Sequence, residues 1–575
     1  MDVCVGHEYF PKYNSTNPSN LLNDEVFGSI KYCILVCLAL SAFCLAKTGP
    51  KCVIPTEIAK NESLAILLFF ITLILLVIAA PILIILAILR TSASVILKLK
   101  HGKNFGGLVE SDAVMWKMPD ITNQLIHILT IQQSKISTPE AFLEHLKQSL
   151  YRPLSKSNAQ KLTSVSKFFL GYAYCLSNQV TIGEICKIIT VDSKKEFIDE
   201  SDLSDILSDL VSKPMPKDNT GLFEILVVQK PLKQIEPDTY QYALIVRLHH
   251  VVADGISLTN YLMKTFADDQ EALACDLKDL IAKFDTSKTK KVEKTGWEKV
   301  TQIAKEINTF MVHFPTVFVN QVFLQDRNCF HGPKLTGKKF AVYAIEKEGE
   351  DLMETVRQIK GRVTGSTFSS VVLTAISRTV GRHMQKRQED TPSFLSVLIT
   401  ALFSVPDMTK APILTNNFSV AVLSLPLFEK SGDAYWQIGL VDKYWNGIKE
   451  RPDFLVNYMM FKHLIGLIPV PILAQILRAD KVTMSISNVP GMPKVHVLGG
   501  QIMEKLVFFT PHRDTAGVGF TITTYDNKFQ MGLMIDKVFN CSKEEAQSLV
   551  DGVLTEIRRM HDELGLAYQK KKVVD

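Results

Sequence analysis

The 575-residue sequence lacks the signatures of several common protein classes. Its ten cysteines form no CxxC pair and no evenly spaced disulfide framework, which favours a reduced, cytosolic main body. Neither sign of charge dominates, because 64 basic and 59 acidic residues leave a net charge of only +5. Without a concentrated basic stripe, no nucleic-acid partner is expected. The chain also has no internal repeat and no low-complexity tract.

An apolar run stands near the N-terminus. Residues 63–89 contain no charged side chain and are long enough to cross a hydrocarbon core of about 30 Å as a helix. Residues 26–46 are a weaker candidate, with Lys31 near the start, for a second span, a membrane-embedded hairpin partner or a signal anchor. Arg90, Lys98 and Lys100 follow the strong run and place the large C-terminal body on the cytosolic side. We expect residues 1–103 to be a membrane anchor.

The remaining length suggests two lobes that mix helices and strands. Residues 139–150 have helical apolar spacing, whereas residues 222–228 and 242–248 are rich in strand-forming side chains. The polar, basic run 286–291 suits an exposed crossover between lobes, or alternatively a surface loop inside one lobe. The sequence thus predicts an α/β protein with an N-terminal lobe at residues 104–284, a crossover linker at 285–335 and a C-terminal lobe at 336–575.

Residues 242–255 are an apolar, strand-like run that ends in polar residues: His249, His250, Asp254 and Gly255. Polar clusters at strand ends are common places for functional sites. Side chains alternate between the faces of a strand, so only one of the two histidines can point into a given pocket. Gly255 permits backbone conformations that other residues resist, and helical apolar spacing follows it. The pattern predicts a strand-to-helix turn.

Histidine suits base catalysis because its unperturbed pKa of about 6.5 lies near the operating pH. Asp254 could then fix the local geometry. One alternative is a pair of structural histidines at a strand end. Another is a metal site that uses His250 and Asp254, but metal sites normally need three ligands, and no HExxH or clustered Cys/His partner is present. We therefore expect no metal.

The string His249-His250-Val-Val-Ala-Asp254-Gly255 matches the HHxxxDG signature of coenzyme A dependent acyltransferases with the chloramphenicol acetyltransferase-like fold. Within that superfamily the chain most resembles the wax ester synthase and diacylglycerol acyltransferase family. Residues 487–491 are similar to that family's SNVPG turn, and residues 517–536 look like the paired strands that follow it. The resemblance extends over about residues 107–539.

The resemblance implies a two-lobed chloramphenicol acetyltransferase-like fold in which His250 is the catalytic base. It also implies that His249, Asp254 and Gly255 support the motif and that Asn488 lies in the opposite lobe, near the acyl donor. Asn488 and Ser369 are candidates to stabilise the oxyanion. One departure stands out, because Ser369-Ser370 occupies the place of the family's usual Asn-Asp, which bears on activity or substrate choice.

The function expected from this resemblance is an O-acyltransferase that moves a fatty acyl group from acyl-CoA to a lipid alcohol. A fatty alcohol or diacylglycerol would give a wax ester or triacylglycerol, with acyl-CoA as substrate and no further cofactor. The expected location is a membrane, the endoplasmic reticulum with the catalytic body in the cytosol, or lipid droplets. The alternatives are a catalytically degenerate lipid-binding protein of the same fold and a membrane scaffold.

Overall fold

The structure is a computed structural model that describes residues 62–118, 124–191, 194–269, 296–323, 328–402, 411–430 and 432–566. The weaker candidate span at residues 26–46 and the basic run 286–291 lie outside the described residues.

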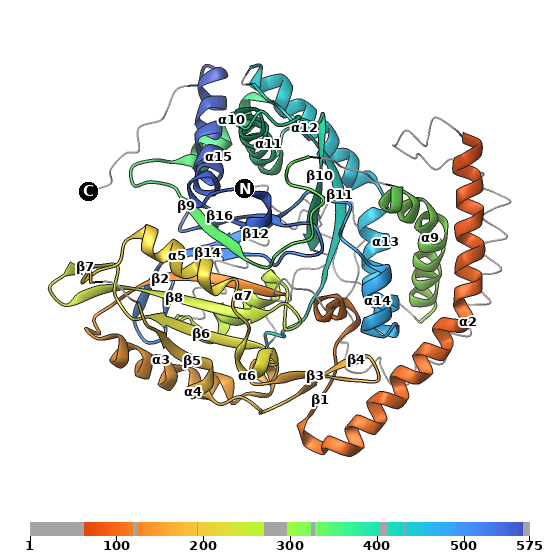
Figure 1. Ribbon diagram of the computed structural model, residues 1–575, viewed down its shortest axis with the longest axis horizontal. Helices are drawn as coiled ribbons and strands as arrows, with labels where there is room; N and C mark the ends of the chain where they lie inside the picture. The colour runs from red at the N-terminus through yellow and green to blue at the C-terminus, as the bar shows by residue number, and fades with distance from the viewer. Residues whose placement is uncertain are drawn as a thin grey trace.

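The first large sheet lies in the lower half of Figure 1. Its strands are β2 (Leu125–Ser134), β5 (Cys186–Ile189), β6 (Phe223–Val228), β7 (Lys233–Glu236), β8 (Thr239–His249), β13 (His496–Val497) and β14 (Gln501–Phe509). They run in the order β13-β14-β2-β8-β6-β5, with β7 paired to β8. The two strands predicted from β-forming composition are therefore confirmed as β6 and β8. A small sheet of β1 (Phe105–Leu108), β4 (Tyr172–Leu176) and β3 (Val165–Phe169) lies beside them.

The second sheet is built wholly from the C-terminal half of the chain. It contains β9 (Lys339–Ile345), β10 (Phe394–Leu402), β11 (Phe418–Pro426), β12 (Met484–Met492), β15 (Val518–Tyr525) and β16 (Lys528–Asp536), in the order β11-β10-β12-β15-β16-β9. The predicted paired strands at residues 517–536 are β15 and β16, which are antiparallel. The C-terminal half also contributes to the first sheet, because β14 pairs with β2 there. The predicted lobe boundaries therefore do not divide the strands cleanly between the sheets.

Residues 487–491 are not a turn, as the sequence suggested, but part of strand β12. The strand pairs in parallel with β15, and its register shifts between Val489 and Met492, where one extra residue is accommodated. A bulge of this kind tolerates a proline inside a sheet. Gly491 is needed there because a Cβ would lie 1.7 Å from Thr524 Oγ1.

Helices pack against the two sheets and against one another. They are α3 (Pro139–Leu154), α4 (Ile182–Ile185), α5 (Glu200–Leu210), α6 (Pro216–Asn219), α7 (Gly255–Phe266), α9 (Gly296–Phe323), α10 (Leu352–Arg362), α11 (Phe368–Lys386), α12 (Ala434–Glu450), α13 (Asp453–Met459), α14 (Val470–Ile476) and α15 (Lys543–Glu563). α3 confirms the predicted helix, which Thr138 caps and which buries Phe142, Leu146 and Leu150. α10, α11, α12 and α15 gather beside the second sheet, at the top of Figure 1. α9 lies inside the predicted 285–335 crossover.

The predicted span belongs to helix α2 (Glu62–His101), which runs along one side of the body (Figure 1). Among the described residues, one helix is long and apolar enough to cross a membrane, and it overlaps this segment. The length and apolar composition of this helix support a membrane span. α2 is fastened to the body where the Arg90 guanidinium donates to the carbonyls of Gly466 and Val109, both at 2.7 Å.

Candidate active site

A cavity of about 290 Å³ lies between the two halves of the body. Its described lining includes residues of the HHxxxDG turn, of helices α11, α12 and α13, and of strands β10, β11 and β12. Five of the residues singled out from the sequence line it: His250, Asp254, Gly255, Ser369 and Asn488. The structure thus gathers around one cavity residues that are far apart in the chain. His249, on the other face of the strand, is not among the lining residues.

The motif forms the predicted strand-to-helix turn. β8 ends at His249, and α7 begins at Gly255. The reason expected for Gly255 is wrong, because its φ is not in the positive range. Instead, a Cβ at this position would lie 3.3 Å from Val489 Cγ2 of β12, a tight contact. Gly255 therefore allows the motif to approach the second sheet closely.

The His250 imidazole is held by an amide that the sequence analysis did not identify. His250 Nδ1 lies 3.1 Å from Asn416 Oδ1. Asn416 Nδ2 donates to the His250 carbonyl at 3.0 Å, which fixes the orientation of the amide. Since Oδ1 can only accept, Nδ1 must donate, and Nε2 keeps its lone pair. His250 thus has the tautomer that a general base requires. No local pattern marks Asn416, which stands 166 positions away in the chain.

Aromatic rings enclose the His250 imidazole. Trp116 stacks on it with ring centroids 4.0 Å apart and planes 13° apart, and Phe418 is tilted against it at 5.6 Å. Burial lowers the pKa of His250 to about 4, although the hydrogen bond with Asn416 acts in the opposite direction. The imidazole is therefore neutral at physiological pH and able to accept a proton.

His249 shapes the turn from the other side of the strand. Its Nδ1 accepts a hydrogen bond from the Val251 N–H at 3.2 Å, and its Nε2 lies 3.5 Å from Lys117 Nζ. Burial lowers the pKa of His249 well below its usual value and the pKa of Lys117 to about 8. His249 is therefore a neutral acceptor that holds the backbone just after His250.

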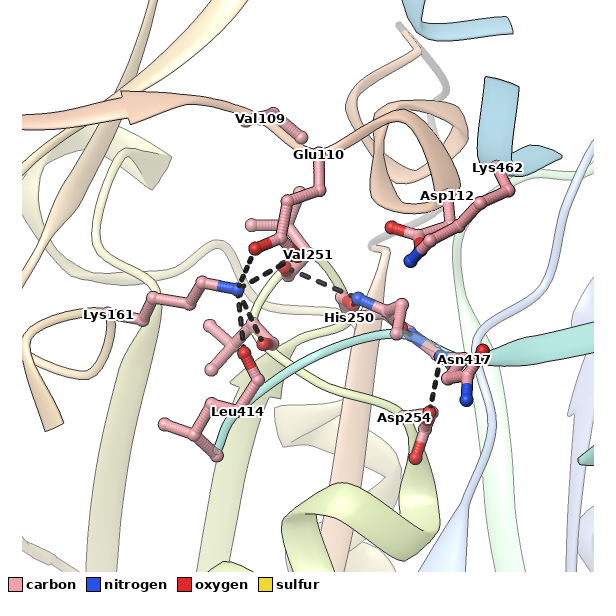
Figure 2. A network of polar contacts seen from close by, with 12 residues as sticks. Val109, Glu110, Asp112, Lys161, His250, Val251, Asp254, Leu414, Asn417 and Lys462 are labelled. Carbon is pink, nitrogen blue, oxygen red and sulfur yellow. Dashed lines mark hydrogen bonds and ion pairs between the residues drawn. The ribbon is translucent and has the colours of Figure 1, made fainter. Parts of the chain in front are cut away.

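Asp254 joins the motif to the segment that carries Asn416. One carboxylate oxygen caps α7 by accepting from Ser257 N–H at 2.8 Å, and the other accepts from Asn417 N–H at 2.7 Å. The Asp254 N–H donates to the Thr415 carbonyl at 3.0 Å. These bonds hold Asn416 beside His250, and Figure 2 shows the contact between Asp254 and Asn417.

Lys161 fastens the same two segments from the other side (Figure 2). Its ammonium donates to the Leu414 carbonyl at 2.7 Å and to the Val252 carbonyl at 3.5 Å, and it pairs with Glu110 at 3.1 Å. Residues 414–417 are thus held to the motif at several consecutive backbone positions.

The Ser369-Ser370 pair begins helix α11. Ser370 is fully buried, forms a capping box with Thr367 and donates to Asp442 Oδ1 at 2.7 Å. Ser369 lines the cavity. The two serines therefore have different surroundings: one stabilises the helix start and the other faces the site. Asp442, from α12, thus brings a carboxylate to the start of α11.

Basic side chains line part of the cavity: Lys449, Arg478, Lys481 and Arg513. Among the described lining residues Asp254 alone is acidic, and backbone N–H groups occupy both of its oxygens. The remaining lining is mostly apolar. The cavity thus combines an apolar interior with positive charge. In the described part of the chain, no group of three or more His, Cys, Asp or Glu side chains is placed to hold a metal ion.

Comparison with known proteins gives a family for one part of the chain and a fold for most of it. Residues 414–560 match the family model described as the WS/DGAT C-terminal domain. The resemblance to wax ester synthases and diacylglycerol acyltransferases is confirmed in this part, which includes Asn416 and Asn488. Comparison with curated protein sequences gives no match.

Solved structures with the same fold include the wax ester synthase/diacylglycerol acyltransferase from Marinobacter aquaeolei. It has a TM-score of 0.52 and 14% identity, over 80% of this chain and 100% of that one. The trichothecene 15-O-acetyltransferase from Fusarium sporotrichioides has a TM-score of 0.53 and 12% identity, over 79% of this chain and 94% of that one. The predicted two-lobed chloramphenicol acetyltransferase-like fold is confirmed.

Replacement of Asp254 by alanine should destabilise the protein more than the loss of a helix cap alone. Asp433→Ala is the matched control, because Asp433 caps α12 through Trp436 N–H from an exposed position. We expect Asp433→Ala to cost about 1 kcal/mol. Asp254→Ala should cost about 1–3 kcal/mol more, because it also leaves the Asn417 N–H unsatisfied. Urea titration of the detergent-purified chain measures both values, and equal losses would contradict the joining role of Asp254.

Proposed function

We propose that this chain is an O-acyltransferase that transfers a fatty acyl group from acyl-CoA to a lipid alcohol, with His250 as general base. The observation that carries the proposal is the fixed tautomer of His250, whose side chain lines a largely apolar cavity. The WS/DGAT C-terminal domain at residues 414–560 supports acyl transfer as the type of reaction.

The positive charge of the cavity supports acyl-CoA as the donor. Coenzyme A carries phosphate groups, and Arg478, Lys481 and Lys449 can supply charge-assisted hydrogen bonds to them. The apolar lining suits the acyl chain and a lipid alcohol alike. An acceptor of this kind partitions into lipid, so a membrane anchor would place the enzyme beside its substrate.

The reaction needs no covalent acyl-enzyme. The alcohol oxygen attacks the thioester carbonyl carbon while His250 Nε2 takes the hydroxyl proton. The tetrahedral intermediate then collapses, the carbon–sulfur bond breaks, and the imidazolium returns the proton to the leaving thiolate. Ser369 and Asn488 line the same cavity and are proposed to donate to the oxyanion. Asn416 accepts from Nδ1–H throughout, so the ring keeps its orientation.

Replacement of His250 by alanine should lower the rate of ester formation by about 100- to 10,000-fold, because the general base is lost. Membranes that contain either form are incubated with labelled acyl-CoA and a panel of fatty alcohols, diacylglycerol, monoacylglycerol and sterol, and the neutral lipids are separated. The panel also names the acceptor. His496→Ala, at an exposed histidine of β13, is the control and should keep the wild-type rate. Equal product from wild type and His250→Ala would exclude His250 as the base, and no product from either would favour a lipid-binding protein.

The pH dependence should report the burial of His250. Because burial lowers its pKa to about 4, the base form persists above that value, and kcat/KM should fall only as the pH drops through it. In Asn416→Asp a carboxylate would face Nδ1–H and favour the imidazolium, so the pKa should rise by about one to three units. The acidic limb of the kcat/KM profile should move to higher pH by the same amount. An unmoved limb in this variant would show that a group other than His250 controls it.

The double variant Arg478→Ala/Lys481→Ala should raise KM for acyl-CoA about tenfold, the equivalent of about 1.4 kcal/mol of lost phosphate binding. Acyl-pantetheine, which carries the same thioester without phosphates, should be used equally well by the variant and the wild type. Lys233→Ala/Lys347→Ala, at exposed positions in β7 and after β9, is the charge-matched control. The same loss with both donors would mean that these side chains do not bind the phosphates.

A further inference from the structure

An exposed apolar patch lies beside the cavity, where three separate segments meet. It comprises Ile85 and Leu89 of α2, Phe168 and Leu170 of the β3–β4 hairpin, and Ile472 and Ile476 of α14, each with 46% to 64% of its surface exposed. Contiguous apolar surface of this kind is uncommon on soluble proteins and marks an interaction site. We call these six residues the apolar patch.

Hydrogen bonds hold the three segments together. The Val470 N–H at the start of α14 donates to the Gly171 carbonyl of the hairpin at 2.8 Å. The Tyr172 hydroxyl, next along the hairpin, lies 3.1 Å from the Leu86 carbonyl of α2 and 3.0 Å from the Leu467 carbonyl. The segments therefore form one surface, on the side of the body where α2 runs (Figure 1).

The turn of the β3–β4 hairpin contains a residue type that is unusual for a turn exposed to water. Leu170 has a φ of 49° and Gly171 a φ of 81°. Two-residue turns with positive φ at both positions favour Asn-Gly or Asp-Gly, because a residue with a bulky side chain resists this conformation. Leu170 adopts it and leaves 64% of its surface exposed. An apolar environment around the tip would compensate for that exposure.

A positive charge beside the apolar patch complements anionic lipid headgroups. Lys167, which directly precedes Phe168, is exposed. Apolar side chains flanked by cations are typical of surfaces that rest in the boundary between headgroups and acyl chains. The apolar exterior of α2 continues this surface.

The ends of α14 connect the apolar patch to the cavity. Phe461 and Leu477 both line the cavity, one on each side of α14 in the sequence. α14 exposes Ile472 and Ile476 on its outer face and buries Leu473 on its inner face. We propose that a lipid bilayer covers the apolar patch and that the lipid alcohol passes from the bilayer into the cavity beside α14. The second part rests on the proposed function.

Fluorescence quenching tests the bilayer contact directly. The full chain with Ile476→Trp is reconstituted in vesicles of phosphatidylcholine and phosphatidylserine with brominated acyl chains, which quench nearby indoles. The added emission should be quenched, whereas that of Tyr435→Trp, at an exposed site on α12, should not. Equal quenching at both sites, or none at Ile476→Trp, would overturn the contact. The measurement does not depend on catalysis.

Two acceptors test the route. Leu170→Glu/Ile472→Glu should slow esterification of a long-chain alcohol dissolved in the bilayer about tenfold, because charge is disfavoured at this depth. It should leave the rate with a short, water-soluble alcohol unchanged, which also shows that the variant is folded. Tyr435→Glu/Trp436→Glu, an equally exposed pair, should change neither rate. Equal losses with both alcohols, or no loss with either, would overturn the route. If the wild type esterifies neither alcohol, the proposed function fails, and the quenching result still decides the contact.

Discussion

The candidate site depends on the joint between the HHxxxDG turn and residues 414–417. His250 directly follows a strand of the first sheet, whereas Asn416, whose amide orients the imidazole, lies two residues before a strand of the second. Asp254 and Lys161 hold the backbone of the two segments in register, and Asn416 then reaches the imidazole. Since neither half contains the complete arrangement, the site exists only when both are packed together. The exchange of β14 into the first sheet makes that packing part of the fold itself.

The surroundings of His250 keep its imidazole neutral and at the same time make it a weak base. Stacking on Trp116 and enclosure by Phe418 remove water from the imidazole, and the resulting fall in pKa keeps it neutral. A weakly basic ring holds a proton only briefly. That suits a reaction in which the proton goes back to a leaving thiolate within the same turnover. The partner of Nδ1 is consistent with this, because a neutral amide orients the ring and stabilises the imidazolium less than a carboxylate would.

The sequence could predict features that depend on neighbouring residues, but not those that depend on contacts between residues far apart in the chain. The strand ending at His249 and the helix after Gly255 have local patterns, and both were found. The paired strands β15 and β16 were found through the family resemblance. Asn416 and Trp116 contact His250 from positions distant in sequence, and neither stands in a recognisable pattern. The errors have the same origin. Gly255 permits a close approach to Val489 and not a special backbone conformation, while residues 487–491 are drawn into β12 by pairing with β15.

The proposed membrane contact and the proposed chemistry constrain each other. An apolar, water-poor cavity keeps the base neutral, but it also retains an ester that is less soluble than either substrate. Release of that product into water would cost the full free energy of transferring its apolar surface to water. Release beside α14 into a bilayer would cost little of this free energy. The donor differs, since its phosphates must remain in water near Arg478 and Lys481. A cavity with an apolar side toward lipid and a basic side toward water separates the two routes. In this arrangement α2 does more than tether the protein, because its bonds through Arg90 and Tyr172 set which side of the cavity faces the membrane.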